Sequence, residues 1–500
     1  HNRFFRPRVS FSKTFQELNN WKIGIYSERE KNERIATASD TLNKSSFYYD
    51  LYRVFLESPV TEKFSFSTKY QQREDFAPFG NEFKKSTIAN ELNVNGTWNI
   101  QRTLQLAGNF TYRRLHLLNE LLVKDVQQES ETFLGRTDVN FTFWKGVLRA
   151  NNTYEIGSGQ EPRVDFTYVK VRQGEGTHIW LDSLYNNDGV IQPNEMEIAP
   201  FPDIADYVRV STFTNQYIRA NYVNLNSSLL LTPKAVWFDK KGLRNFMSKF
   251  STQSTLIINR KTLDNADISP WNPFLLDVAD TSLVSVSSNI RNILFFNRAN
   301  PKYDLQIGNS MLSNKFVQTS GFESRRNTEQ FFRSRMNATK SISAQLNLTR
   351  GERLSDSQFF DNRDYNILSW QIEPQFTWLP SRDFRTIVSY KFQTDRNTFD
   401  DNPAEATQNN LSLEMTFNSG SNTSIRARSS FVNIDFEGTP NSPVGFAILN
   451  GLQPGKNFLW NLSLDRQLSR NLRLNLSYEG RKTGEARVVH VGRAQVAAVF

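Results

Sequence analysis

The chain has 500 residues, of which 38% are hydrophobic and 13% are aromatic. So many aromatic side chains exclude a disordered chain, and no apolar run approaches the roughly 18 residues that a membrane-spanning helix needs. The absence of cysteine excludes disulfides and thiolate chemistry. The net charge of +9 comes from scattered basic residues, so we expect no nucleic acid as a partner.

Apolar and polar residues alternate along many segments, which indicates β-strands with one apolar and one polar face. Residues 115–128 suit a short helix in a loop. The predicted fold class is all-β, a large antiparallel up-and-down transmembrane β-barrel of about 22–26 strands. In chain order, the predicted strands are 4–14, 21–33, 46–57, 62–75, 86–98, 103–116, 131–143, 147–157, 163–173, 206–214, 223–238, 246–262, 286–298, 303–310, 328–338, 341–351, 364–378, 384–397, 407–418, 422–436, 456–466, 472–482 and 488–500.

Short turns and longer loops alternate between these strands, with few exceptions. Tight turns are predicted at 379–382, 419–421 and 467–470, whereas 398–406 and 437–455 are longer loops. Outer-membrane barrels show this asymmetry, with short periplasmic turns and longer extracellular loops. A repeat of fixed period, which a soluble solenoid or propeller would have, is missing from the sequence. We therefore expect the bacterial outer membrane as the location and its lipids as partners.

The C-terminus carries a short motif. The chain ends at Phe500, after alternating Ala494, Val496 and Ala498. This ending resembles the C-terminal signal of bacterial outer-membrane barrels, and the resemblance implies the barrel-assembly machinery as a partner through Phe500. Because the chain starts at His1 without a signal peptide and the predicted strand number is odd, we expect a C-terminal fragment of a longer precursor.

A second resemblance runs from Tyr168 to Val210. This stretch is similar to a segment of large, mostly uncharacterised outer-membrane barrels of the Bacteroidota. The resemblance implies a location and a fold, and little about activity. The residues that carry it include Asn186-Asn187-Asp188-Gly189, Asn194-Glu195-Met196-Glu197 and Phe201-Pro202-Asp203, together with the closing Gly492-Arg493-Ala494-Gln495-Val496.

The same segment contains part of a calcium-loop pattern. Aligned on its glycine, the pattern D-x-[DN]-x-[DN]-G-x5-E places ligand positions three, five and twelve at Asn186, Asp188 and Glu195. Position one is Leu184, which has no oxygen ligand, and Asp182 lies two residues too early unless the loop bulges. A water-exposed acidic turn is the alternative interpretation. The candidate metal ligands are Asp182, Asn186, Asp188 and Glu195, and the candidate ion is Ca²⁺.

Residues 174–205 are predicted to form an acidic insert between two strands of a single barrel domain, residues 1–500. Counting turns from either end places the insert between a downward and an upward strand, on the periplasmic side. We expect a folded insert that partly closes the periplasmic mouth of the lumen. Its apolar residues Ile179, Trp180, Phe201 and Ile204 would pack on the inner wall.

Two functions stay open at this point. The first is a conduit or transport channel across the outer membrane, because a barrel of more than about 20 strands encloses a lumen that needs a plug. The second is a structural or surface-interaction barrel whose loops bind a partner envelope protein or a ligand. The loop 263–282 could cover the lumen or dock such a partner, because it contains Trp271, Phe274, Leu275 and Leu276.

An outer-membrane hydrolase is a remote third alternative. His178 lies near Glu175, Asp182 and Ser183 in sequence, but sequence alone does not show the geometry of a catalytic triad. The G-x-S-x-G elbow of α/β-hydrolases is missing from the sequence. We therefore expect no enzyme, no catalytic residue and no cofactor other than Ca²⁺.

Overall fold

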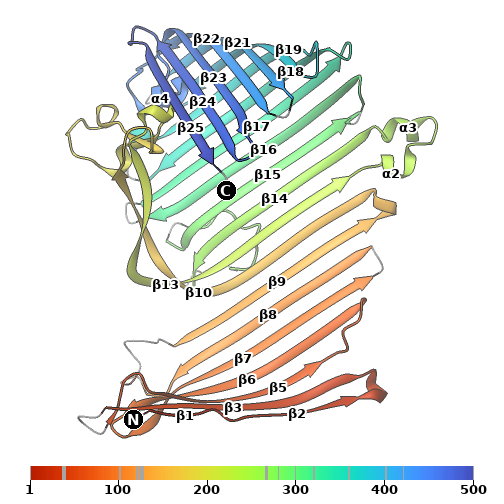
Figure 1. Ribbon diagram of the computed structural model, residues 1–500, viewed down its shortest axis with the longest axis vertical. Coiled ribbons are helices and arrows are strands. Elements are labelled where there is room, and N and C mark those ends of the chain that lie inside the picture. Colours follow the sequence, from red (N-terminus) through yellow and green to blue (C-terminus); the bar gives the residue numbers. More distant parts are fainter. Residues whose placement is uncertain are drawn as a thin grey trace. The chain divides into compact units, whose positions relative to one another are not determined.

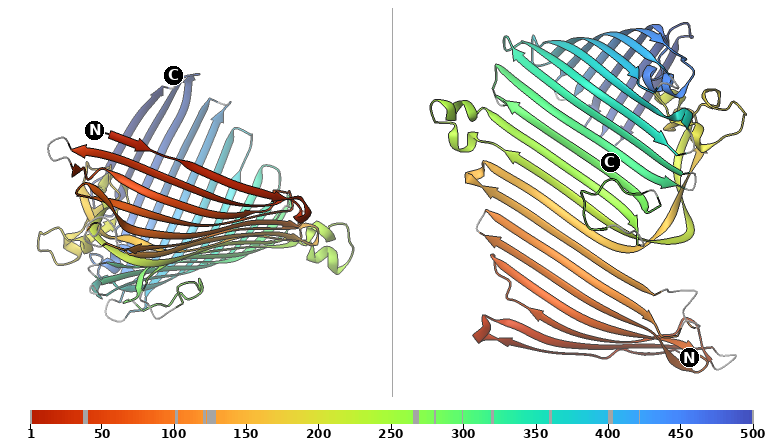
Figure 2. Two further views of the ribbon diagram at one scale, coloured as in Figure 1. Left: turned by 90° about the horizontal axis from the view of Figure 1, so that it is seen from below. Right: turned by 180° about the vertical axis from the view of Figure 1, so that it is seen from behind.

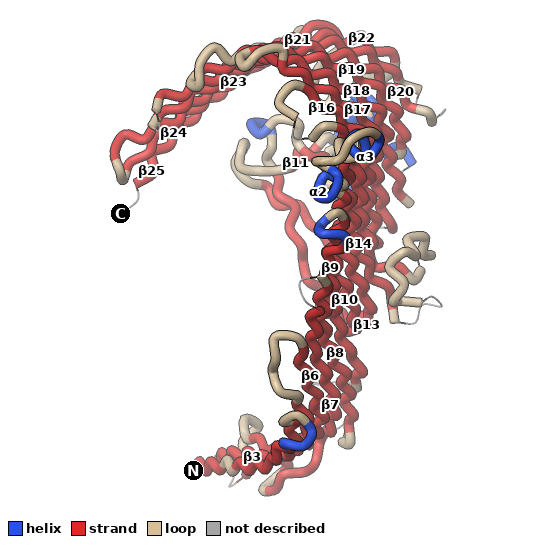
Figure 3. The backbone as a smooth tube through the Cα atoms, turned by 90° about the vertical axis from the view of Figure 1, so that its right-hand side faces the viewer, coloured by secondary structure: helices blue, strands red, loops and turns tan. Residues whose placement is uncertain are grey.

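The computed structural model describes residues 2–498 apart from 37–40, 101–102, 120–121, 123–128, 265–268, 280, 299, 319–320, 359–360, 400–402 and 421. Strands make up most of these residues, and the helices are few and short (Figure 3). The fold class is all-β, with antiparallel up-and-down strands, as the alternation predicts. The chain forms two compact units: His1–Pro162, Gln216–Leu231 and Thr255–Val286 in unit 1, and Arg163–Asn215, Thr232–Ser254 and Ser287–Phe500 in unit 2.

Unit 1 contains the N-terminal strands. Each long strand pairs with the next one along the chain (Figure 1). Its register aligns apolar residues in rows, for example Tyr70, Leu92 and Tyr112 on three successive strands. The strands are β1 (Asn2–Phe5), β2 (Arg8–Phe15), β3 (Trp21–Ala36), β4 (Thr41–Leu42), β5 (Phe47–Glu57), β6 (Phe64–Phe79), β7 (Glu82–Ile100), β8 (Leu104–Leu117) and β9 (Ser130–Phe143).

Unit 2 contains the C-terminal strands, which again pair in chain order (Figure 2). They are β16 (Tyr303–Gln318), β17 (Gly321–Asn337), β18 (Ile342–Ser357), β19 (Tyr365–Trp378), β20 (Phe384–Asn397), β21 (Glu405–Ser419), β22 (Thr423–Glu437), β23 (Gly455–Ser469), β24 (Leu472–Thr483) and β25 (Val489–Ala498). Four strands contribute residues to both units: β10 (Leu148–Lys170), β13 (Tyr207–Leu231), β14 (Phe250–Leu263) and β15 (Leu283–Phe296).

The two faces of the unit 2 strands differ in polarity. On one face, an unbroken row of paired large apolar side chains crosses β20 to β23, and each is 43–53% exposed. The members of this row are Tyr390, Leu411, Phe431 and Phe458. On the other face, Gln371, Gln393 and Gln408 pair across β19 to β21. Successive side chains of a strand point to opposite faces, so this contrast follows directly from the period-two pattern of the sequence.

The remaining elements are short. Each helix among the described residues is too short or too polar to pass through a membrane. The helices are α2 (Lys234–Trp237), α3 (Leu243–Met247) and α4 (Pro443–Leu449), and single 3₁₀ turns lie at Gln16–Leu18, Trp144–Gly146, Asp182–Leu184, Pro193–Glu195, Pro202–Ile204 and Asp361–Arg363. Two further short strands are β11 (His178–Trp180) and β12 (Met196–Ile198). Of the helix predicted at 115–128, residues 115–117 continue β8, and most of the rest lies outside the described residues.

The described residues contain 25 strands, of which β1, β4, β11 and β12 have only two to four residues each; the other 21 are one fewer than the lower end of the predicted 22–26. Two predicted divisions are wrong. Segments 147–157 and 163–173 belong to the single strand β10 of 23 residues, and 206–214 and 223–238 mostly to β13 of 25 residues. The alternation of apolar and polar residues lapses in the middle of each of these strands, so the pattern divides one continuous strand into two.

Candidate functional site

The connection between β10 and β13 is a folded insert of unit 2. Strands β11 and β12 pair antiparallel within it, and His178 of β11 also pairs with Tyr207 at the start of β13. A 3₁₀ turn precedes β12, and it is capped reciprocally by Gln192 and Glu195 with Pro193 at its first position. Because proline suits a first helical position and the two side chains satisfy backbone donors, this local sequence fixes where β12 begins.

The insert brings three of the four candidate metal ligands together. One carboxylate oxygen each of Asp182, Asp188 and Glu195 lies within 4.8 Å of the others. The backbone N–H groups of Asp188 and Gly189 donate to the Asp182 carboxylate at 3.1 and 2.9 Å. These bonds, with Gly189 at a φ of 73°, fold the loop back so that Asp182 takes part in spite of its early position in the pattern.

Asn186, the fourth candidate ligand, lies beside this cluster. Its Nδ2 donates to Oδ2 of Asp188 at 3.0 Å, and its Oδ1 accepts from the Asp188 N–H at 3.3 Å. Leu184, which stands at position one of the pattern, belongs to the 3₁₀ turn that begins at Asp182. This turn and the hydrogen bonds from Asp188 and Gly189 place the Asp182 carboxylate beside Asp188.

Glu195 is the most buried member of the cluster, with 0% of its surface exposed. Its Oε2 accepts from Trp180 Nε1 at 2.8 Å and from the Gln192 N–H at 3.2 Å. Its Oε1 has no hydrogen-bond partner. A carboxylate buried in this way carries a desolvation cost that two neutral donors offset only in part.

Two arginines of unit 2 outside the insert hold it in place. Arg363, which follows β18, pairs with Glu197 at 3.0 Å, and the Tyr185 hydroxyl donates to the same carboxylate at 2.7 Å. Burial, followed by the charge of Glu197, raises the pKa of Tyr185. Burial alone would lower the pKa of Arg363, but the charges of Glu197, Tyr185 and Glu323 and the hydrogen bond to Glu197 together outweigh burial, so the pKa is raised. The carboxylate of Glu197 is therefore the electrostatic centre of this contact.

The second arginine is Arg481 near the end of β24. Its guanidinium pairs with Asp203 through two hydrogen bonds and lies over the ring of Phe201, with 4.2 Å between Cζ and the ring centroid. Phe201 thus contacts the wall, as predicted. Trp180 instead donates to Glu195 inside the insert, and this use of its indole was not predicted.

A second segment covers the same polar face beside the insert. Helix α4, in the connection between β22 and β23, packs with Val444, Ile448 and Leu449 on a buried apolar cluster that includes Ile367 and Val432. Ser442 caps the helix by accepting from the Gly445 N–H at 3.0 Å. These buried apolar residues interrupt an otherwise polar face at the position where α4 packs against it.

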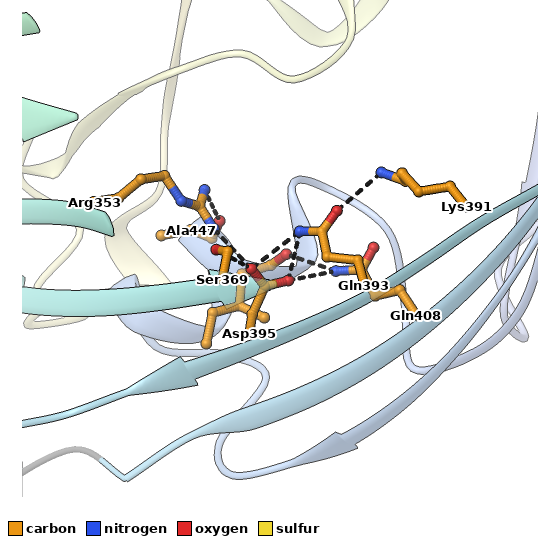
Figure 4. A network of polar contacts seen from close by, with 8 residues as sticks. Arg353, Ser369, Lys391, Gln393, Asp395, Gln408 and Ala447 are labelled. Atoms are coloured by element: carbon orange, nitrogen blue, oxygen red, sulfur yellow. Dashed lines mark hydrogen bonds and ion pairs between the residues drawn. The ribbon is translucent and has the colours of Figure 1, made fainter. Parts of the chain in front are cut away.

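Asp395 is the centre of a polar network under α4 (Figure 4). Its side chain is 0% exposed and accepts from Ser369, Gln393 and Gln408. Arg353 Nη2 lies 3.6 Å from the same carboxylate, while its Nη1 donates to the Ala447 carbonyl of α4 at 3.0 Å. Gln408 also donates to the Ile448 carbonyl at 3.3 Å. The network therefore joins four strands, β18 to β21, to the last turn of α4.

A cavity of about 370 Å³ lies between the insert, α4 and the strands β20 to β24. Basic side chains outnumber acidic ones among its lining residues. Those with charged or large side chains include Phe201, Asp203, Lys391, Arg428, Glu479 and Arg481.

The insert lies at the same end of unit 2 as the long connections. Its partners Arg363, Gly451 and Arg481 belong to, or adjoin, the connections between β18 and β19, β22 and β23, and β24 and β25. The predicted placement at the end with the short turns is therefore wrong. Its cause is the division of β10 and of β13 into two strands each, because one extra strand reverses the count from either end.

The loop 263–282, predicted to cover the lumen or to dock a partner, packs on the apolar face of unit 1. Trp271 contacts Phe133 with ring centroids 4.1 Å apart, and its carbonyl accepts from Tyr154 at 2.6 Å. Phe133 pairs with Tyr112 and so shares the face of that apolar row. Arg260, only 1% exposed, donates to the carbonyls of this loop. The contacts of the described residues of this loop therefore lie on the apolar face and not on the polar one.

Two other sequence-based expectations have simple outcomes. His178 Nδ1 shares a hydrogen bond with Thr177 Oγ1 at 2.8 Å, and its ring packs edge-on against Tyr168. Ser183, the nucleophile of the remote hydrolase alternative, is exposed to solvent. Phe500, the expected assembly signal, lies outside the described residues, and β25 ends at Ala498.

No protein-family model matches the chain, and no curated protein matches it in sequence. Among solved structures, it is similar to the siderophore receptor PirA from Pseudomonas aeruginosa, with 10% identity over 96% of this chain and 73% of that one, at a TM-score of 0.40. It is also similar to the FrpB iron transporter from Neisseria meningitidis, with 11% identity over 99% and 80%, at 0.38. A third is the outer membrane transporter YddB from Escherichia coli, with 8% identity over 99% and 74%, at 0.36.

Proposed function

We propose that the chain forms the wall and plug of a conduit across the bacterial outer membrane. The observation that carries this proposal is the opposite character of the two faces of unit 2. One face exposes paired rows of large apolar side chains, while the insert and α4 cover the polar face. In outer-membrane barrels, an apolar face of this kind contacts the lipid chains, and a polar face lines the water-filled interior.

The size of the apolar face supports a membrane environment. Soluble monomers rarely expose contiguous apolar patches of more than a few hundred Å². The exposed side chains here include Trp370, Phe376 and Leu411 at 59%, 46% and 53%. Aromatic side chains of this size have about 150–250 Å² each, and about half of that is exposed here, so a row of several such side chains already exceeds that limit.

The plug role rests on how the insert and α4 are attached. Both segments are bound by buried or half-buried arginines of unit 2: Arg363 of the β18–β19 connection and Arg481 of β24 hold the insert, and Arg353 of β18 holds α4. Contacts of this kind need specific geometry, and they hold a segment in one position. A segment fixed across the polar face limits what passes along it.

Conductance in planar lipid bilayers tests this function. The variant replaces residues 174–205 by a four-residue turn, which can join β10 to β13 because these strands are hydrogen-bonded neighbours. We expect the wild type to show small or rare currents and the variant to show larger and steadier ones. The matched control shortens 269–276, which packs on the apolar face and leaves the polar face unchanged.

If neither the wild type nor the variant lacking the insert conducts current, the conduit function is contradicted. A surface-interaction barrel would then be the better assignment. An equal increase with the 269–276 control would show that general loosening, and not removal of a plug, opens the path.

A further inference from the structure

We propose that the insert binds one Ca²⁺ ion through the carboxylates of Asp182, Asp188 and Glu195. The site lies wholly inside the insert, so this proposal does not depend on the conduit function. It extends that function by naming an ion that stabilises the proposed plug.

The spacing of the three carboxylates fits a single ion. Ca²⁺ takes six to eight oxygen ligands at about 2.3–2.6 Å. Two oxygens on opposite sides of such an ion lie about 4.6–5.2 Å apart, and neighbouring ligands lie closer. The three candidate oxygens lie within 4.8 Å of one another, so all three can bind the same ion. The amide of Asn186, next to Asp188, can add a fourth oxygen by rotation, and backbone carbonyls and water would complete the shell.

Glu195 gives an observation that is independent of the clustering. Its carboxylate is fully buried, and its Oε1 has no hydrogen-bond partner. Trp180 and the Gln192 backbone fix the other oxygen, so the orientation of the group is set by the protein. A buried anionic oxygen without a donor is costly, and a cation beside it removes that cost.

The distribution of positive charge in the insert points the same way. Glu197 and Asp203, which lie on its wall-facing side, each pair with an arginine. Among the described residues, the ion pairs found include none to Asp182, Asp188 or Glu195. Three carboxylates this close repel one another, and a divalent ion neutralises most of their charge.

A bound ion would link two parts of the insert. It would join the loop at Asp182 and Asp188 to Glu195, which immediately precedes β12. Two residues after Glu195, Glu197 of β12 accepts a hydrogen bond from Arg363. Removal of the ion should therefore loosen both the acidic loop and the contact of the insert with the wall.

Terbium luminescence tests the site in the full chain, refolded in detergent. Tb³⁺ substitutes for Ca²⁺ and is excited through a nearby indole, which Trp180 provides because its Nε1 lies 2.8 Å from Glu195. We expect saturable emission that Ca²⁺ reverses and that equal Mg²⁺ leaves largely intact. Asp188→Asn and Glu195→Gln should each weaken Tb³⁺ binding at least tenfold, and Trp180→Phe should remove most of the emission.

The matched control is Glu175→Gln, the same chemical change at an exposed carboxylate of the same insert. It should leave Tb³⁺ affinity within twofold of the wild type. Asp188 is exposed, so Asp188→Asn is expected to fold even where Glu195→Gln does not. Absence of Ca²⁺-reversible emission from the wild type, or equal affinity of Asp188→Asn and wild type, would overturn the proposal. Emission that survives Trp180→Phe would place the ion elsewhere and overturn it as well.

Discussion

Arg481 of β24 and Asp203 of the insert form a two-pronged ion pair across 278 residues of sequence, with Nη2 2.8 Å from Oδ2. The side chains are only 13% and 15% exposed. A half-buried bidentate pair is much stronger than a surface pair, and loss of one partner leaves the other charge poorly solvated. This contact should therefore govern how firmly the insert is held.

Arg481→Gln and Asp203→Asn should each lower the free energy of opening of the insert by about 1–3 kcal/mol. Hydrogen exchange of the Thr177 and Ala199 amides, which are bonded within and next to the insert, measures this free energy. The double variant should lose less than the sum of the two single losses. Arg493→Gln is the control, because its pair with Glu479 is 4.0 Å long and mostly exposed, and it should change little.

His178 should make the insert less stable in mild acid. Burial, followed by the charge of Arg209, lowers the pKa of His178 from its ordinary value of 6.5, although Glu197 acts in the opposite direction. The unfolded segment therefore takes up a proton as the pH falls through 6.5, whereas the folded insert does so only at lower pH. Stability is full above pH 6.5 and falls below it.

Amide exchange of the insert at pH 7.5 and 5.5, corrected for the intrinsic rates, checks this pH dependence. Carboxylates titrate mostly below this window, so the histidine dominates the difference. His178→Gln should flatten the profile. An insert that becomes more protected at pH 5.5 would show that the sign is wrong.

Gly445→Ala should destabilise α4 and its packing on the strands of unit 2. Alanine normally favours a helix over glycine by about 1 kcal/mol. Here a Cβ at residue 445 would meet the backbone carbonyl oxygens of Thr439 and Pro440, which cannot move aside as a flexible side chain can. Overpacking of this kind costs about 1–3 kcal/mol and outweighs the helix propensity.

The measurement for Gly445→Ala is the exchange rate of the Asn450 amide, which donates to Phe446 at the end of α4. Gly492→Ala in β25 is the control, since a Cβ there has no neighbour within 4 Å, and its α4 amides should exchange as in the wild type. Slower exchange in Gly445→Ala would mean that the gain in helix propensity exceeds the steric cost of the added Cβ.

Removal of Phe500 should impair assembly more than the stability of the folded chain. One terminal side chain contributes about 2 kcal/mol of burial at most, whereas the expected role of this residue is recognition by the assembly machinery. The amount of protein in the outer membrane should fall, while the variant refolded in detergent should keep a melting temperature near that of the wild type. Normal amounts in the outer membrane would contradict the role of Phe500.

The strand pattern was predictable because it depends on local alternation. The boundaries of β20 agree with the prediction at both ends, and β19, β24 and β25 differ by two residues or fewer. The acidic cluster was also predictable, since its members lie within 14 residues of one another. The contacts that hold the insert in place were not predictable, because Glu197 and Arg363, for example, are 166 residues apart in sequence. Lone arginines in a chain with 60 basic residues give no signal of such a contact.

The buried network at Asp395 illustrates a second limit. Its members occupy the polar face of ordinary strands, where the alternation predicts exposure to water. They are buried only because α4 returns across that face, and the sequence of α4 is too short to show a helical period. Long-range covering of a face cannot be read from the pattern of the strand that is covered.

Accessibility labelling decides which side of the membrane the insert occupies. The insert shares its end of unit 2 with the long connections, which are extracellular in outer-membrane barrels, so we expect it near the outer mouth. Ser183→Cys is an exposed probe in the acidic loop, and the chain has no other cysteine. Ser381→Cys, also exposed, lies in the short turn between β19 and β20 at the opposite end of the strands.

An impermeant maleimide added to intact cells should label Ser183→Cys within minutes and should leave Ser381→Cys unlabelled. Permeabilisation of the outer membrane should then expose Ser381→Cys, which shows that the second cysteine is present and reactive. The reverse order of labelling would place the insert on the periplasmic side. The contacts of the insert with Arg363 and Arg481 would then lie at a periplasmic end, and the long connections of this barrel would face inward, against the usual asymmetry of such proteins.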